Sequence, residues 1–466
     1  MAMGKRNKQP QRSLWVETGQ LTRGPGHPFY RRLNQLLDKH GFDEFVESEC
    51  RQYYAENVGR PSLPPSTYFR LLLIGYFEGI DSERGIAWRV SDSISLRDFL
   101  GLTLSDPTPD HSTISRNRRL IAVETHQEVF SWMVKRLAKS GLLRGKTLGI
   151  DATTLEANAA LRSIVRRDTG EAYSDFLTRL AQESGIETPT RQDLAKLDRK
   201  RKGKGSNDDW QHPLDPDSKI TKMKDGRTHL AHKVEHAVDM ETSAVVAVTL
   251  HGGCTADTES FAATLDEAVE VLGDVLSDPE FSRSLHESPL CEVVADKGYH
   301  SNDILTACKK QEIRSYISEP SRGRRNWKNK AAAQSATYAN RRRIRGPRGQ
   351  SLLRARGEKL ERGFAHCYAT GGLRRPHLRG HPNILKRLLI HAAGCNLGLL
   401  MRHLTGFGKP RTLQGRLAAL FLLLRALYCS LKRSRTLSSL HERLFAAFGL
   451  VGLPLRRRMA IDLLFV

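Results

Sequence analysis

Residues 146–154 read Lys-Thr-Leu-Gly-Ile-Asp-Ala-Thr-Thr, a short apolar run that ends abruptly in the carboxylate of Asp151. Strands that are buried on both faces of a parallel sheet carry such continuous apolar runs. Open α/β sheets bind their ligands at the carboxyl ends of the strands. We therefore predict a buried strand over residues 147–150 that delivers Asp151 to a site at its carboxyl end.

Two further acids complete a candidate metal site. The segment Cys291–Tyr299 repeats the same design and ends its apolar run at Asp296, and Glu361 lies in a segment of helical composition. Three oxygen ligands with no Cys or His beside them suit Mg²⁺ or Mn²⁺ better than zinc. A single aspartate at a strand end is more often a helix cap, so the interpretation depends on all three acids in this order within a basic chain.

The sequence around these acids resembles that of DDE transposases from bacterial insertion sequences. The three acid blocks that carry the resemblance are Gly149–Thr153, Ala295–Tyr299 and Glu361–His366. The similarity continues through Thr370–Arg375, His377–His381, Asn383–Arg387 and Asn396–Arg402, and it reaches upstream to Asp110–Arg116. It covers roughly residues 25–410, and together the motifs are highly specific.

The resemblance implies that Asp151, Asp296 and Glu361 are the catalytic residues and the ligands of Mg²⁺, for which Mn²⁺ substitutes. It also implies cleavage and joining of double-stranded DNA by a homodimer or larger assembly. Many relatives carry a lysine seven positions after the glutamate, where this chain has Tyr368. Many relatives also carry an arginine before the glutamate. Here Arg354 stands seven residues before Glu361 but four before Glu358; Glu361 is favoured as the third acid, and Glu358 stays an alternative.

Composition independently favours a polyanionic partner. The 466 residues carry a formal net charge of +23, and the sequence pI is about 9.9. The seven cysteines form no C-x-x-C pair, which argues against structural zinc and fits a reducing cytosol. The most apolar run, residues 417–424, is far shorter than the roughly 20 residues of a membrane span. We expect a bacterial, cytoplasmic, nucleoid-associated protein without a membrane segment.

The order of predicted elements is that of an α/β, ribonuclease-H-like domain with a mixed five-stranded sheet flanked by helices, preceded by an all-α domain. In this topology the first and fourth strands lie side by side, so Asp151 and Asp296 can share a metal. We predict a basic flexible arm (1–25), a helical DNA-binding domain (26–125), a catalytic domain (126–405) and a Leu/Arg-rich extension (406–466) without an assigned function. The catalytic domain carries a polar, solvated insertion at about 159–227 and a basic insertion at about 320–350.

A candidate recognition helix follows a proline-rich turn. Asp110 is a plausible N-cap, since its carboxylate can accept hydrogen bonds from the free amides of the first turn. The side chains that we expect on the solvent face of this helix are Ser112, Ser115, Arg116, Asn117 and Arg119. An ordinary surface helix has a similar composition, but together with the resemblance the pattern favours DNA reading in the major groove.

Basic residues near the acids are candidates for phosphate contacts. They are Lys297, Arg324, Arg325, Arg341, Arg342, Arg343, Arg345 and Arg362. Trp327 lies among them, and it either stacks on an extruded base or packs on the domain.

Some polar residues invite a structural interpretation. We expect Asp257 to cap the helix that follows it, and Lys386 and Arg387 to lie on the exposed face of a long helix. His232 and His236 are four residues apart on a predicted strand, about 13 Å, so we do not expect them to share a metal.

Two rival functions stay open at this point. One is a decayed or repurposed transposase that only binds DNA, and the other is a structure-specific nuclease on the same fold. Retention of all three acids argues against the first, and an assay for strand joining distinguishes the second.

Overall fold

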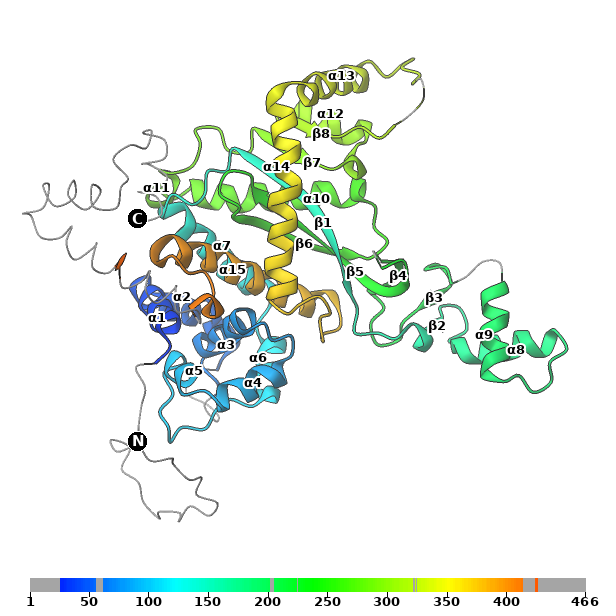
Figure 1. Ribbon diagram of the computed structural model, residues 1–466, viewed down its shortest axis with the longest axis horizontal. Coiled ribbons are helices and arrows are strands. Elements are labelled where there is room, and N and C mark those ends of the chain that lie inside the picture. Colours follow the sequence, from blue (N-terminus) through cyan, green and yellow to red (C-terminus); the bar gives the residue numbers. More distant parts are fainter. Residues whose placement is uncertain are drawn as a thin grey trace, which may run out of the picture.

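The computed structural model describes residues 26–55, 62–201, 205–223, 225–321, 323, 325–413 and 424–425 (Figure 1). The predicted arm at residues 1–25 and nearly all of the C-terminal extension beyond residue 413 lie outside these ranges.

The chain begins with a bundle of short helices. They are α1 (Pro28–Lys39), α2 (Phe42–Cys50), α3 (Pro65–Glu78), α4 (Glu83–Ser91), α5 (Ile94–Phe99) and α6 (His111–Leu120). Side-chain caps define the starts of the last three, because Ser82, Ser93 and Asp110 each accept a hydrogen bond from a first-turn amide. The predicted Asp110 cap is confirmed. Helix α3 is buried along most of its length and forms the centre of the bundle.

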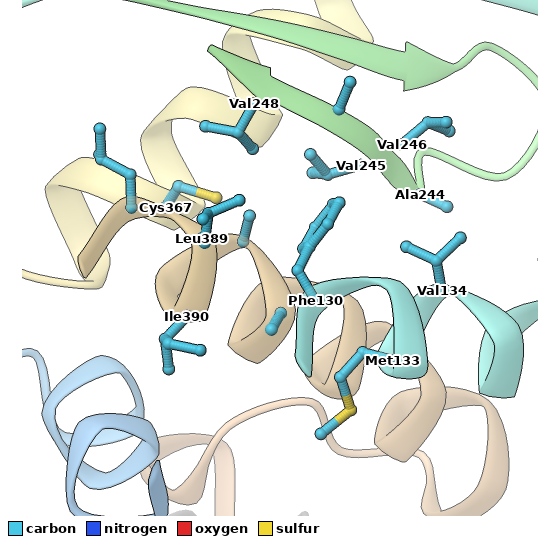
Figure 2. Packing of buried hydrophobic residues seen from close by; sticks show 14 of the residues in the cluster. Phe130, Met133, Val134, Ala244, Val245, Val246, Val248, Cys367, Leu389 and Ile390 are labelled. Carbon is cyan, nitrogen blue, oxygen red and sulfur yellow. The ribbon is translucent and has the colours of Figure 1, made fainter. Parts of the chain in front are cut away.

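Two longer helices join this bundle to the sheet. Helix α7 (Val123–Lys139) packs lengthwise on α15 (His381–Thr405), and both contact strand β6 (Figure 2). Phe130, Val245 and Leu389 meet in this layer, all buried. Helix α15 is long and apolar enough to cross a membrane by composition, but 83% of its most apolar stretch is buried inside the protein, so it is a core helix.

The sheet has the predicted mixed topology. Its strands are β1 (Thr147–Glu156), β4 (Lys219–Lys222), β5 (Thr228–Asp239), β6 (Val245–Gly252), β7 (Glu292–Ala295) and β8 (Arg314–Ile317). Strands β1, β7 and β8 run parallel, β5 pairs antiparallel with β1, and β6 forms a hairpin with β5. The ribonuclease-H-like fold class is confirmed, although the described sheet has six strands instead of five because β4 adds to β5.

The remaining helices cover the sheet and its edge. They are α10 (Asp257–Leu276), α11 (Pro279–Ser282), α12 (Asn302–Lys310), α13 (Ala331–Arg345) and α14 (Pro347–Phe364). Figure 1 shows α14 crossing β1, and a π-helical segment, Ala365–Thr370, continues it. A Cβ atom on Gly149 would lie 2.6 Å from Sδ of Met240 and 2.7 Å from Cδ1 of Leu360, so glycine lets α14 cross β1 closely without displacing either side chain.

The predicted solvated insertion is folded. Strands β2 (Val165–Arg166) and β3 (Trp210–Gln211) pair beside α8 (Tyr173–Glu183) and α9 (Arg191–Lys200), and the unit projects from the sheet (Figure 1). Trp210 is buried at its centre against Ala157, Ile164 and Leu230. Residues 196–200 of this insertion lie in α9, and residues 202–204 lie outside the described ranges.

The prediction that Lys386 and Arg387 are exposed is wrong. Lys386 is 7% and Arg387 3% exposed, because the N-terminal helices cover this face of α15. Lys386 Nζ donates to the carbonyl of Arg118 at 3.0 Å, and Arg387 Nη2 donates to the carbonyl of Ile80 at 2.9 Å. Both cations therefore fasten the helical bundle to the core helix of the sheet domain.

Candidate functional site

Asp151 and Asp296 lie at the same level, where the parallel pairing of β1 with β7 ends. Strand β1 continues to Glu156, so Asp151 lies within this strand, and the prediction that the strand ends before Asp151 is wrong. Ile150 pairs with Ala295 in the register of β1 and β7, and each aspartate is the next residue of its chain. One guanidinium joins them: Arg356 Nη1 lies 2.8 Å from Asp151 Oδ2, and Arg356 Nη2 lies 3.9 Å from Asp296 Oδ2. The structure therefore brings the first two predicted acids together, with Asp296 at the carboxyl end of β7 and Asp151 in the middle of β1.

The two carboxylates have different surroundings. Asp151 has a side chain that is 22% exposed, and its Oδ1 accepts from the amide of Ala152 at 2.9 Å. Burial raises the pKa of Asp151; Arg356 opposes this shift, and nearby Asp296 adds to it. Asp296 is 41% exposed and caps a 3-10 turn, Lys297–Tyr299, by accepting from the amide of Gly298 at 3.1 Å. The pair thus combines a buried and a solvent-facing acid.

Asp257 is a third acid near this pair, and the prediction that it caps α10 is wrong. The N-cap is Ala256, and Asp257 Oδ1 instead accepts from Lys233 Nζ at 2.6 Å. Asp257 Oδ2 lies so close to Gly298 that a Cβ atom there would collide with it, and its charge contributes to the raised pKa of Asp151. The position of the Asp257 carboxylate depends on Lys233 of β5, and the sequence around Asp257 does not indicate this ion pair.

A buried polar network supports the loop that bears Asp296. Tyr299 donates to Glu235 Oε1 at 2.6 Å, and Ser260 donates to the same oxygen at 2.8 Å. Lys233 Nζ is 3.7 Å from Glu235, which is completely buried. Because Glu235 has these partners inside the core, we regard it as a support for the loop and not as a candidate metal ligand.

Glu361 lies on α14, and its carboxylate makes no hydrogen bond or ion pair with another described residue. On the same helix Leu360 faces Gly149, and Lys359 reaches one flank, donating to the carbonyls of Met240 and Glu241 beside the start of β1. Each helical residue turns by about 100°, so Glu361 lies on the opposite flank, towards the carboxyl end of β1.

Glu358 has a different orientation on α14. It lies about 200° from Leu360 around the helix and hence points away from the sheet. It pairs with Arg362 at 2.7 Å, and both side chains are about two-thirds exposed. The helical phase therefore favours Glu361 over Glu358 as the third acid. The ion pair also shows that Arg362, a predicted phosphate contact, already has a carboxylate partner.

The donor set suits a hard cation. No group of three His, Cys, Asp or Glu residues within the described ranges is already gathered tightly enough to hold a metal ion. The two aspartates provide oxygen donors only, and His236 is occupied by Tyr368. Carboxylate oxygens without nitrogen or sulfur fit Mg²⁺ or Mn²⁺.

The predicted recognition helix α6 is only partly exposed. Arg116 and Arg119 are exposed and Ser115 is half-buried, but the expectation that Asn117 faces solvent is wrong. Asn117 is 4% exposed, accepts from the Tyr54 hydroxyl at 3.0 Å and donates to the carbonyl of Thr113 at 2.9 Å. Its amide is therefore engaged within the bundle, and the predicted side chains of α6 that are exposed are Ser112, Arg116 and Arg119.

The predicted basic residues between positions 325 and 345 also divide into paired and exposed side chains. Arg341 and Arg325 both pair with Glu319, at 2.6 and 3.1 Å, and Arg343 Nε donates to the carbonyl of Ser315 at 2.9 Å. By contrast, Arg342 and Arg345 are exposed on α13.

Two other predicted contacts lie near these residues, and a third falls outside the described ranges. Trp327 is half-buried, with the Arg325 guanidinium 4.4 Å from its ring and the Tyr338 ring at 6.2 Å. Lys297 is exposed beside Asp296. Arg324 lies outside the described residues.

Comparisons with known proteins agree with this arrangement. A family model described as "Transposase domain (DUF772)" matches residues 17–120, which include the described helices α1–α6. A second model, "Transposase DDE domain", matches residues 183–397, which begin after Asp151 and include Asp296 and Glu361. No curated protein and no solved structure matches the chain.

Proposed function

The chain belongs to the transposases with a DDE catalytic domain, enzymes that transfer phosphoryl groups of DNA, and we propose that Asp151, Asp296 and Glu361 form its metal-binding active site. The observation that carries this proposal is the convergence of Asp151 and Asp296 at the point where the parallel pairing of β1 and β7 ends. Glu361 joins them from the facing flank of α14 when its side chain turns towards β1.

The reaction that this site supports is cleavage and joining of DNA strands. Bound Mg²⁺ would supply Lewis-acid stabilisation of the charge that develops on the phosphate oxygens. A water molecule or a 3′-hydroxyl attacks phosphorus, and the bond to the opposite oxygen breaks, so no covalent enzyme intermediate forms. Asp151 and Asp296 would hold the cation, and the exposed Lys297 beside them would contact the scissile phosphate.

Recognition and retention of DNA involve separate surfaces in this proposal. Arg116 and Arg119 of α6 read the terminal repeats of the insertion sequence, and Arg342 and Arg345 of α13 neutralise backbone phosphates. Two transposon ends have to be held together for strand transfer, so the active form is a homodimer or larger assembly on double-stranded DNA. It works in the bacterial cytoplasm at the nucleoid.

A second candidate function is DNA binding without chemistry. The observation that favours it is the separation of Glu361, which makes no polar contact with either aspartate in the part of the chain that the structure describes.

A plasmid assay distinguishes the two functions. The full-length protein is incubated with supercoiled plasmid carrying candidate terminal repeats, in Mg²⁺, Mn²⁺ or EDTA. We expect metal-dependent cleavage at the repeats and insertion products, both lost in Asp151→Asn. Binding to the repeats without cleavage in either metal would overturn the catalytic proposal, and cleavage without insertion would indicate a nuclease.

A further inference from the structure

Arg356 occupies the centre of the acid site. Its side chain reaches from α14 and is 18% exposed, and both of its ion pairs are with the candidate metal ligands Asp151 and Asp296. The neighbouring cations on the helix are directed elsewhere, since Lys359 donates to two carbonyls and Arg362 pairs with Glu358. Arg356 is therefore the cation of α14 that neutralises the acid pair.

A metal ion and this guanidinium compete for the same oxygen. Asp151 Oδ1 already accepts from a backbone amide, which leaves Oδ2, the atom bonded to Arg356, as its more available donor. Like charges repel strongly at a partly buried site, so a divalent cation on Asp151 and Asp296 disfavours the guanidinium in its present place. Metal binding would therefore release the Arg356 guanidinium, which then has neither carboxylate as its partner.

We propose that Arg356 exchanges the acid pair for a DNA phosphate when the metal binds, so that metal and DNA bind cooperatively. The guanidinium fork matches a phosphate as well as it matches a carboxylate, and it stays charged at all relevant pH values. While Arg356 pairs with the two aspartates, their affinity for metal is low. DNA raises this affinity because its phosphate becomes the new partner of Arg356. Arg356 acts here as a positioning residue, and the inference rests on the metal site of the proposed function.

Thermodynamic linkage gives this proposal a direct test. If DNA raises the affinity for metal, metal must raise the affinity for DNA by the same factor. Mn²⁺ binding to the full-length protein is measured by electron paramagnetic resonance, with and without duplex DNA. The variants are Arg356→Gln, Arg356→Lys, Asp151→Asn, and Lys359→Gln as the matched control, because Lys359 is a cation of the same helix that donates to backbone carbonyls and not to the acids.

We expect DNA to tighten Mn²⁺ binding to the wild type by about tenfold, within the usual range of coupled sites. Arg356→Gln should bind Mn²⁺ about tenfold more tightly than the wild type without DNA, and DNA should add little. Arg356→Lys should keep part of the coupling, and Lys359→Gln should match the wild type. Thermal unfolding of each variant verifies that the fold is retained.

The possible failures have different meanings. If Asp151→Asn lowers Mn²⁺ affinity while Arg356→Gln matches the wild type or binds more weakly, the partner exchange is overturned and the metal site stands. If the wild type and Asp151→Asn bind Mn²⁺ equally poorly with and without DNA, the metal site is overturned, and the exchange with it.

Discussion

The hydroxyl of Tyr368 lies 2.5 Å from Nε2 of His236, and both side chains are buried. His236 pairs with Asp151 across β5 and β1, and Tyr368 lies in the π-helical segment that follows Glu361. Burial lowers the pKa of His236 to about 3, so its imidazole is neutral where it shares this hydrogen bond with the hydroxyl. This hydrogen bond fixes the end of the glutamate-bearing helix against the strand beside the first aspartate.

Tyr368→Phe should destabilise the protein by about 1–3 kcal/mol, because it leaves a buried imidazole nitrogen without its partner. Its affinity for DNA should not change. Tyr368→Lys introduces a charge into the same buried position and should destabilise more. Urea unfolding measures both effects. A stable Tyr368→Lys variant with tighter DNA binding would show that this position faces the substrate.

Glu361→Gln should abolish metal-dependent cleavage, as should Asp151→Asn, with DNA affinity unchanged or slightly improved by the loss of negative charge near phosphate. Glu358→Gln is the matched control on the same helix, and we expect it to retain activity because Glu358 points away from the sheet. Cleavage and filter-binding assays measure the two properties separately. The opposite ranking of the two glutamates would transfer the role of third acid to Glu358.

Arg342→Ala and Arg345→Ala should each reduce the slope of log K against log salt by about 0.9 on duplex DNA, because each removes one phosphate contact. The loss should be equal for terminal repeats and unrelated DNA. Arg341→Ala should mainly lower stability, since Arg341 pairs with Glu319 and holds the pKa of that acid down to about 2. Salt titrations in which Arg341→Ala alone changes the slope would contradict this division.

Arg116→Ala should weaken binding to the terminal repeats selectively, by about 1–3 kcal/mol if it contacts a base edge. Asn117→Ala should instead lower the free energy of unfolding, because it removes a buried amide that bonds Tyr54 and Thr113. Competition binding against unrelated DNA and urea unfolding distinguish these outcomes. Sequence selectivity that depends on Asn117 without loss of stability would show that α6 opens on DNA.

Acid should destabilise the fold before the carboxylates titrate. His126 is buried, accepts from the Tyr68 hydroxyl at 3.1 Å, and has its pKa lowered to about 3 by burial. An unfolded histidine titrates near 6.5, so the unfolded state binds the extra proton below that pH.

Stability is therefore complete above about pH 6.5 and falls as the pH decreases towards 3, by at most about 1.4 kcal/mol per pH unit for this residue. His126→Gln should reduce the steepness of this fall, measured by urea unfolding between pH 7.5 and 5. An unchanged pH dependence would show that His126 is not held neutral in the folded state.

The sequence by itself determined the strands, most helix positions and the two aspartates. Apolar runs define β1 and β7 locally, and right-handed crossovers make their neighbouring placement natural. Capping residues such as Asp110 mark helix starts within a few positions. These features depend on residues close together in the chain, and for that reason the fold class followed from the sequence.

Only the tertiary structure decided which polar side chains are available to act. Asn117, Lys386 and Arg387 have polar character that suggests solvent, yet helices distant in sequence cover them. Arg356 carried no local signal among the surrounding arginines, and its place between Asp151 and Asp296 arises because α14 crosses β1 over Gly149. Burial and pairing of a charged group depend on what packs against it, and that partner is set by the assembled fold, not by its sequence neighbours.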